Sequence, residues 1–306
     1  MIVSVNCFAK INLFLKVYGK RPDGYHDIIS LMQSIDLADS LVLEETDGEG
    51  IEISCSNPDV PVDERNLVWK AAGVLAEQVG RPAAGLRVKI TKNIPLMGGL
   101  AGGSADGAGA LAGLCRLWGL DFDDSVLLRL AAKVGSDVPF CLVGGTALVR
   151  GRGEIVEPMP VGIVESAKGS GAFLLVLPPV GVDTKSAYDA LDESRLKEAR
   201  KWDDLMIEYV ETRDNWMVAI ADASFPVLFH NDFEASLFSS SPELVAVSTN
   251  LRNHAGHAIL SGSGPSMFAW FTDVSEANAA RDRYVPIAGE TALVAYPVAD
   301  GVQVMG

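Results

Sequence analysis

Cysteine is scarce in this sequence of 306 residues, and long apolar runs are missing. The four cysteines, Cys7, Cys55, Cys115 and Cys141, are far apart and show neither a CxxC pair nor a Cys/His ligand spacing. The sequence therefore predicts reduced thiols rather than a zinc site or a disulfide framework. No apolar run reaches the roughly 18 residues of a membrane span, and the N-terminal residues lack the basic and apolar regions of a signal peptide. We expect a cytoplasmic protein without a membrane partner.

Basic residues are also few, since 25 Lys and Arg stand against 40 Asp and Glu and give a formal net charge of -15. A negative field of this size repels phosphodiester backbones and anionic lipid headgroups. Nucleic acid and membrane surfaces are therefore not expected as partners. A polyanionic ligand would have to be held locally, by backbone N–H groups, helix N-termini and a few placed cations.

The overall composition is that of a globular protein, with 48% hydrophobic and 21% charged residues. A chain of this length corresponds to about two domains. The segment from Glu157 to Gly171 combines prolines and glycines and separates two blocks of similar size. We therefore predict two domains, one over residues 1–160 and one over residues 161–306.

Apolar periodicity predicts the order of strands and helices. Strands are expected over residues 2–17, 40–45, 51–54 and 86–91, in the apolar run 172–182, and on both sides of a glycine turn within 256–271. Helices are expected over residues 66–79, 105–118, 125–134, 186–218 and 242–254. Strand 86–91 leads directly into a glycine-rich segment, which is the most informative feature of the sequence.

The common nucleotide-binding motifs are absent, because the chain has no GxxxxGK[ST], no GxGxxG at a strand-to-helix junction, and no HRD or DFG triplet. Instead, six of the 16 residues from Ile94 to Gly109 are glycine, between a strand and a helix. Such a loop lets consecutive backbone N–H groups converge on an anion, and the following helix adds its positive end. The alternative is a packing turn, which this density of glycine disfavours. The loop predicts a phosphate site that has no lysine of its own.

Two charged residues could supply chemistry to such a site. Lys10 lies inside an otherwise apolar strand, and Asp137 lies between glycine and apolar residues. A lone lysine in a strand is more often a solvated residue, and a Gly-Ser-Asp segment is more often a turn or a helix cap. For each residue the functional and the structural interpretation therefore stay open. Together near a phosphate loop they would suit phosphoryl transfer, with the carboxylate taking a hydroxyl proton and the ammonium stabilising negative charge.

Two further segments have both a functional and a structural interpretation. The cluster from Ser261 to Ser266 could bind an anion or close the first site, or it could be a hairpin turn. In the turn Asp23–His26, Tyr25 could stack on a flat ligand and His26 could hydrogen-bond to it, although a plain surface turn is the commoner case.

Four segments, taken in order, resemble the GHMP kinase superfamily and, within it, the family of 4-diphosphocytidyl-2-C-methyl-D-erythritol kinases. They are AKINLFLKVYGKRPDGYHDI at 9–28, IPLMGGLAGGSADGAGAL at 94–111, GSDVPFCLVGGTALVRGRGE at 135–154 and LSGSGPSMFAWF at 260–271. The first and third segments are the most discriminating, because other GHMP kinases share the two glycine loops. The resemblance covers nearly the whole chain.

The resemblance implies a two-domain α+β fold with the active site in the cleft between the domains. It also implies ATP-dependent phosphorylation, with Mg²⁺, of the 2-hydroxyl of 4-diphosphocytidyl-2-C-methyl-D-erythritol, which gives the 2-phosphate and ADP in the non-mevalonate isoprenoid pathway. By motif match, Asp137 is the base and Lys10 its cationic partner. The residues implied in ATP binding are Pro95, Gly98, Gly99, Leu100, Ala101, Gly102, Gly103, Ser104 and Ala105, with Asn66 and Lys92 on the adenine side.

The same resemblance assigns the acceptor side. Asn12, Tyr25 and His26 would recognise cytosine, with Tyr188 opposite Tyr25, while Asp137, Thr184, Gly262 and Ser263 would touch the remainder of the substrate. Ala101 and Ala105 stand where some relatives carry glycine and serine, so Ser104 is the hydroxyl left to contact a phosphate or Mg²⁺. The expected partner is the small-molecule substrate alone, for a monomer or weak homodimer.

Two other functions remain as alternatives. A GHMP kinase acting on another acceptor alcohol would share the ATP chemistry but not the cytosine pocket. A catalytically silent nucleotide-binding protein could use the same fold, although intact Lys10 and Asp137 argue against it.

Overall fold

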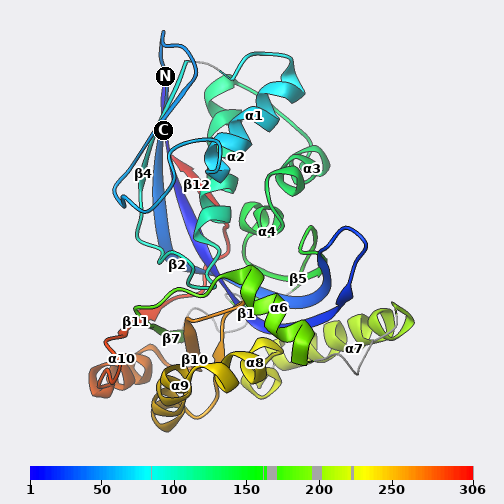
Figure 1. Ribbon diagram of the computed structural model, residues 1–306, viewed down its shortest axis with the longest axis vertical. Helices are drawn as coiled ribbons and strands as arrows, with labels where there is room; N and C mark the ends of the chain where they lie inside the picture. The colour runs from blue at the N-terminus through cyan, green and yellow to red at the C-terminus, as the bar shows by residue number, and fades with distance from the viewer. Residues whose placement is uncertain (84, 161, 164–170, 195–201, 222–223, 306) are drawn as a thin grey trace.

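The computed structural model describes residues 1–306 except 84, 161, 164–170, 195–201, 222–223 and 306. Its first half is a sheet built on two long paired strands, β1 (Ile2–Lys20) and β2 (His26–Glu45), covered on one face by helices (Figure 1). Apolar side chains alternate into the core along β1, as in Val3, Val5 and Cys7, and this explains why the segment forms a half-buried strand.

Among the described residues the first sheet has eight strands, in the order β12-β1-β2-β4-β3, with β5 paired to β2 and β6, and β8 paired to β1. Its further strands are β3 (Ile51–Cys55), β4 (Leu86–Thr91), β5 (Thr146–Gly151), β6 (Ile155–Pro158), β8 (His230–Asn231) and β12 (Val302–Met305). Two of these, β8 and β12, come from the second half of the chain. The last strand is antiparallel to the first, with Ser4 opposite Met305 and Cys7 opposite Val302.

The helices over the first sheet are α1 (Leu67–Val79), α2 (Gly102–Trp118), α3 (Asp124–Val134) and α4 (Val138–Val143). Helix α2 lies close to β1 and β2 because small residues face the sheet. A Cβ atom on Gly109 would lie 2.2 Å from the sulfur of Cys7, which is too short for any side chain. This close packing fixes the N-terminus of α2, and with it the preceding glycine loop.

The second half forms a four-stranded sheet in the order β11-β7-β10-β9 within the described residues. Its strands are β7 (Ala172–Leu177), β9 (Ala258–Leu260), β10 (Met267–Phe271) and β11 (Thr291–Ala295). The surrounding helices are α6 (Thr184–Ser194), α7 (Trp202–Ala221), α8 (Phe233–Ser240), α9 (Pro242–Ala255) and α10 (Val274–Arg283), with a 3-10 turn η1 (Phe225–Leu228). Helices α9 and α10 pack on β7 and β10 (Figure 1).

The mixed helices and sheets confirm the predicted α+β class, and most of the predicted elements are present. The predicted helix 186–218 is divided between α6 and α7, with residues 195–201 outside the described part. Part of the predicted boundary segment, 161 and 164–170, is also outside it, and the division at residue 160 stays a prediction. No helix of the described chain is long and apolar enough to span a membrane.

Candidate active site

A cavity of about 690 Å³ lies where segments from both halves of the chain meet. It is lined by β1, the turn before β2, the glycine loop before α2, the segment before α4, the first turns of α6, and the turn between β9 and β10. The predicted site residues on its wall are Lys10, Asn12, Tyr25, His26, Pro95, Gly98, Gly99, Ala101, Gly102, Gly103, Ser104, Asp137, Thr184, Tyr188, Gly262 and Ser263. The structure thus brings together residues that are up to 253 positions apart, from Lys10 to Ser263.

The glycine loop presents the start of α2 to this cavity. Ala101 precedes the helix without a side-chain cap bond in the described structure, so the N–H groups of the first turn are available to a ligand. Among the described residues, the only non-glycine residues at positive φ are Met97 (φ 51°) and Ala101 (φ 58°), both in this loop. The loop is therefore held in a strained conformation by its surroundings.

Lys10 and Asp137 form an ion pair at the cavity wall, with 3.7 Å between Lys10 Nζ and Asp137 Oδ2. Lys10 is buried, and its ammonium also donates to Asn12 Oδ1 at 2.7 Å and to the carbonyl of Gly99 at 3.0 Å. The Asp137 side chain is 31% exposed and makes no cap bond to α4 in the described structure, so its carboxylate can reach a ligand. This pair can accept a proton and stabilise an anion next to the phosphate loop.

Asn12 extends this contact into the sheet. Its amide nitrogen donates to Ser30 Oγ at 2.8 Å, and Ser30 donates to the carbonyl of Phe14 at 2.7 Å. Because both polar atoms of the Asn12 side chain are engaged, its visible role is to orient Lys10, and the expected contact with cytosine stays a prediction. Sequence reasoning missed Ser30, which is fully buried in a part of β2 where no strand was predicted.

Another part of the cavity wall is aromatic. The rings of His26 and Tyr188 stack with centroids 4.8 Å apart, and His26 Nε2 lies 2.8 Å from Asp192 Oδ1. Burial raises the pKa of the Tyr188 phenol, which keeps it neutral. Tyr25 is 49% exposed, with the guanidinium of Arg152 4.9 Å from its ring centroid.

This arrangement contains two residues that sequence reasoning missed. Asp192 follows Tyr188 by one helical turn, a spacing that could have placed the two on one face of α6. Arg152 had no local signal. A stack of Tyr188 opposite Tyr25 stays a prediction, because Tyr188 contacts His26 here.

The second glycine turn closes the cavity against the first loop. Ser261 Oγ donates to the carbonyl of Gly99 at 3.0 Å, and the amide of Ser266 donates to the carbonyl of Gly98 at 3.2 Å. Gly99 has φ 76°, and a Cβ there would lie 2.2 Å from the carbonyl oxygen of Ser261, so only glycine fits. Thr184 Oγ1 lies 3.3 Å from Ser263 Oγ. The turn is therefore both a hairpin and a wall of the site.

The chain matches two family models, the GHMP kinases N terminal domain over residues 66–145 and the GHMP kinases C terminal domain over residues 206–290. A 4-diphosphocytidyl-2-C-methyl-D-erythritol kinase of Prochlorococcus marinus (strain MIT 9303) is 39% identical over 292 residues, which cover 93% of this chain and 89% of the relative. The chain belongs to this kinase family. The kinase of that name from Carboxydothermus hydrogenoformans (strain ATCC BAA-161 / DSM 6008 / Z-2901) is 40% identical and covers 88% of each chain.

Solved structures agree with the family assignment. A crystal structure of a 4-(cytidine 5'-diphospho)-2C-methyl-D-erythritol kinase has a TM-score of 0.71 and 28% identity, covering 96% of this chain and 99% of the other. A homoserine kinase from Cytophaga hutchinsonii has a TM-score of 0.74 at 21% identity, covering 99% and 97%, and shows the shared fold. The expected GHMP kinase fold is confirmed.

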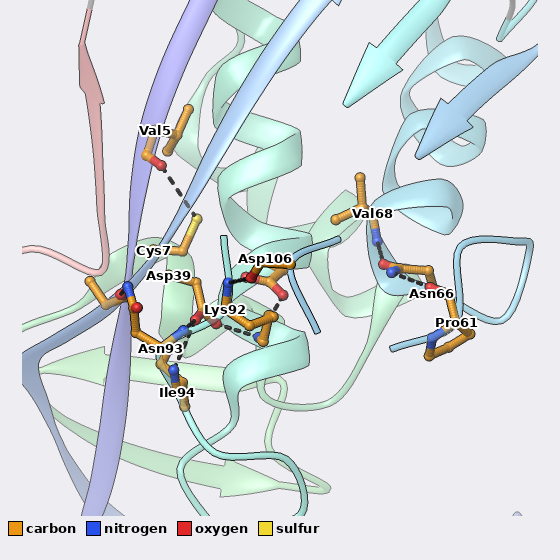
Figure 2. Close-up of polar contacts among 12 residues, drawn as sticks. Val5, Cys7, Asp39, Pro61, Asn66, Val68, Lys92, Asn93, Ile94 and Asp106 are labelled. Atoms are coloured by element: carbon orange, nitrogen blue, oxygen red, sulfur yellow. Dashed lines mark hydrogen bonds and ion pairs between the residues drawn. The ribbon is translucent and has the colours of Figure 1, made fainter. Parts of the chain in front are cut away.

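Four residues expected on the ATP side of this kinase do not line the cavity: Asn66, Lys92, Leu100 and Ala105. Asn66 caps α1, because its amide oxygen accepts from the N–H of Val68 at 2.9 Å, and its amide nitrogen donates to the carbonyl of Pro61 at 2.7 Å (Figure 2). Leu100 and Ala105 are fully buried. Their expected contacts with ATP stay predictions.

Lys92 lies next to the start of α2, since a Cβ atom on Gly102 would lie 3.2 Å from its Nζ, and it forms a buried cluster with Asp39 and Asp106 (Figure 2). Its ammonium forms an ion pair with Asp39 and lies 2.8 Å from Asp106 Oδ2. Asp39 also accepts from the N–H groups of Asn93 and Ile94, whereas Asp106 Oδ1 is buried without a partner in the described structure. Burial and the nearby Asp39 raise the pKa of Asp106 to about 7, although Lys92 opposes the shift.

The cysteines do not take part in the site. All four are free, and burial raises the pKa of Cys7, Cys115 and Cys141, which keeps these thiols protonated. Within the described residues, no group of three His, Cys, Asp or Glu side chains could hold a metal ion.

Proposed function

We propose that this protein transfers the γ-phosphoryl group of ATP to the 2-hydroxyl of 4-diphosphocytidyl-2-C-methyl-D-erythritol. The products are the 2-phosphate and ADP, and the reaction is a step of the non-mevalonate isoprenoid pathway. The proposal is supported chiefly by the Lys10–Asp137 pair between two glycine loops, in a chain of this kinase family.

The pair supplies the chemistry of the acceptor. Asp137 accepts the proton of the acceptor hydroxyl as the hydroxyl oxygen attacks the γ-phosphorus of ATP and ADP leaves. Lys10, 3.7 Å from the carboxylate, stabilises negative charge on the reacting oxygens. Lys10 can do this because Asn12 and the carbonyl of Gly99 hold its ammonium in place. The first-turn N–H groups of α2 bind the phosphates of ATP, which compensates for the absence of a lysine in the loop.

The donor set also fits Mg²⁺, which would neutralise phosphate charge when bound with ATP. Mg²⁺ usually keeps several waters and takes one or two protein oxygens together with phosphate oxygens. Ser104 lies on the cavity wall, and its hydroxyl is the protein oxygen that would hold the ion beside the phosphates, since the Asp137 carboxylate is assigned to the acceptor hydroxyl. A cluster of three protein ligands is not required.

The aromatic part of the cavity wall, formed by Tyr25, His26 and Tyr188, suits the cytosine ring. Tyr25 offers an exposed ring face, and His26 offers an imidazole whose orientation is fixed by Asp192 and Tyr188. Stacking and hydrogen bonding on one base give selectivity for the cytidylated acceptor.

We also propose that the protein acts in the cytoplasm as a monomer or weak homodimer. The Lys10–Asp137 pair and both glycine loops belong to a single chain, which is what a monomeric enzyme requires. Sedimentation at several protein concentrations tests this state, and a tight dimer would contradict it.

The test of the reaction is release of ADP with Mg²⁺ and ATP against a panel of acceptor alcohols. The panel contains 4-diphosphocytidyl-2-C-methyl-D-erythritol, its form without the cytidylyl group, mevalonate, homoserine and galactose. We expect turnover with the first compound alone. Turnover of another acceptor would reassign the substrate, and ATP binding without turnover of any acceptor would support a silent nucleotide-binding protein.

A further inference from the structure

The segment His230–Glu234 lies beside the second glycine turn and has no role in the motifs considered so far. It contains β8 and the first residues of α8. The strand β8 runs parallel to β1, with His230 opposite Phe14 and Asn231 opposite Leu15. Asp232 strengthens this contact, because its carboxylate accepts from the N–H of Val17 at 2.8 Å. The segment is thus fixed to the strand that carries Lys10.

Asn231 connects this segment to the second glycine turn. Its side-chain nitrogen donates to the carbonyl oxygens of Leu260 and Gly262, both at 2.8 Å, and its oxygen accepts from the N–H of Phe233 at 2.9 Å. The residue is only 4% exposed. Both amide hydrogens are therefore used to hold the backbone on two sides of Ser261.

Glu234 also holds Leu260, the residue that directly precedes this turn. Its Oε1 accepts from the N–H of Leu260 at 3.2 Å, and the carboxylate pairs with Arg252, also at 3.2 Å. The N–H and the carbonyl of Leu260 are thus both bound by side chains of one short segment.

The turn held in this way meets the reacting groups. A Cβ atom on Gly262 would lie 3.2 Å from Lys10 Nζ and 2.9 Å from the carbonyl oxygen of Gly99, so the Gly262 backbone packs directly against the Lys10 contacts. Gly262 and Ser263 line the cavity, and their N–H groups have no hydrogen-bond partner within the described residues. A small displacement of the turn would move these two donors relative to Lys10 and Asp137.

We propose that Asn231 is a positioning residue that holds the second glycine turn so that the N–H groups of Gly262 and Ser263 face a phosphate group of the bound acceptor. This inference rests on the proposed function. Asparagine suits the position because both of its amide hydrogens are donated to carbonyl oxygens. A carboxylate there would point negative oxygens at the same carbonyls and could not donate.

The test compares Asn231→Ala and Asn231→Asp with the unmodified protein, using the KM of each substrate, kcat, and the rate of amide hydrogen exchange across residues 258–268. Asn250→Ala is a matched control, because the Asn250 side chain also donates to a backbone carbonyl, that of Val285 at 3.0 Å, at an exposed position. We expect kcat/KM for the cytidylated acceptor to fall by about tenfold or more in Asn231→Ala and further in Asn231→Asp, since an error of about 1 Å in position can cost on the order of 100-fold. The KM for ATP should change by less than about twofold, and exchange should become faster in 258–268.

Two results would overturn the proposal. One is an unchanged kcat/KM for the acceptor in Asn231→Ala, and the other is an equal loss for both substrates together with a general loss of stability. If neither Asn231 variant folds, Glu234→Ala, which removes the acceptor of the Leu260 N–H, must show the same selective loss, and an unchanged acceptor kcat/KM there would refute the role. Inactivity of the unmodified protein on the acceptor panel would instead contradict the proposed function, and the exchange rates would still test the positioning.

Discussion

Replacing Asp106 with asparagine should change how the stability of the protein depends on pH. The folded protein raises the pKa of this carboxyl from an ordinary value of 3.8 to about 7, chiefly because the group is buried. Between these two values the folded state holds a proton that the unfolded state has released, so the free energy of unfolding falls as the pH rises. Three pKa units at about 1.4 kcal/mol each correspond to about 4 kcal/mol. Asparagine cannot titrate, so this loss should be absent from the variant.

Urea unfolding of both proteins at several values between about pH 4 and about pH 8 measures the effect. We expect the free energy of unfolding of Asp106→Asn, relative to the unmodified protein, to increase with pH up to about pH 7 and to level off above it. Asp282→Asn is the control, because Asp282 is an exposed carboxylate whose side chain is 67% accessible. Parallel pH dependences of the Asp106→Asn variant and the unmodified protein would refute the reasoning, since they would show that Asp106 titrates alike in the folded and unfolded states.

Three further predictions concern the site itself. Asp137→Asn should reduce kcat by about 1,000-fold through loss of the base while calorimetry still detects ATP binding, and turnover near that of the unmodified protein would remove Asp137 from this role. Tyr25→Ala should raise the KM for the cytidylated acceptor by about tenfold and that for ATP far less, so unchanged values for both would show that Tyr25 lies outside the site. Ala101→Gly should raise the free energy of unfolding by about 0.5–1 kcal/mol, because φ 58° costs alanine about 1–2 kcal/mol and glycine regains only part of this through its flexible unfolded chain. A lower urea midpoint for this variant would contradict the assigned strain.

Local sequence patterns predicted many of the strands and helices of the fold. The strand predicted over 86–91 and the helix over 125–134 match β4 and α3 closely, because alternation and helical spacing report burial of one face. The glycine loop was predictable for a different reason, since few other structures tolerate so many glycines between a strand and a helix. Pairing between distant segments has no such local signal, so the contact of β12 with β1 was not predicted.

The residues of the candidate site also differ in how far they could be predicted from the sequence. From the residues alone, Lys10 and Asp137 each had both a functional and a structural interpretation. The resemblance to the kinase family assigned both to one active site, and the structure places them 3.7 Å apart. Lys92 was expected near adenine, but its partners Asp39 and Asp106 lie on β2 and α2 and meet it only in the folded chain. Asn231 was missed because its strand has two residues, too few for any periodicity. Side chains that hold backbone groups are hard to find from sequence, since their partners carry no residue-specific signal.

The pairing of the last strand with the first has a consequence for synthesis of the chain. The edge of β1 over residues 4–7 gains its partner only when residues 302–305 have been made (Figure 1). At roughly 5–20 residues per second, the ribosome leaves this edge open for roughly 15–60 seconds after β1 has emerged. An unpaired strand edge is a template for pairing with another chain. On a polysome several nascent copies expose this edge of β1 at the same time, so β1 of one copy can pair with a strand of another. Synthesis of residues 302–305, rather than completion of the glycine loops, is the event that covers this edge of β1.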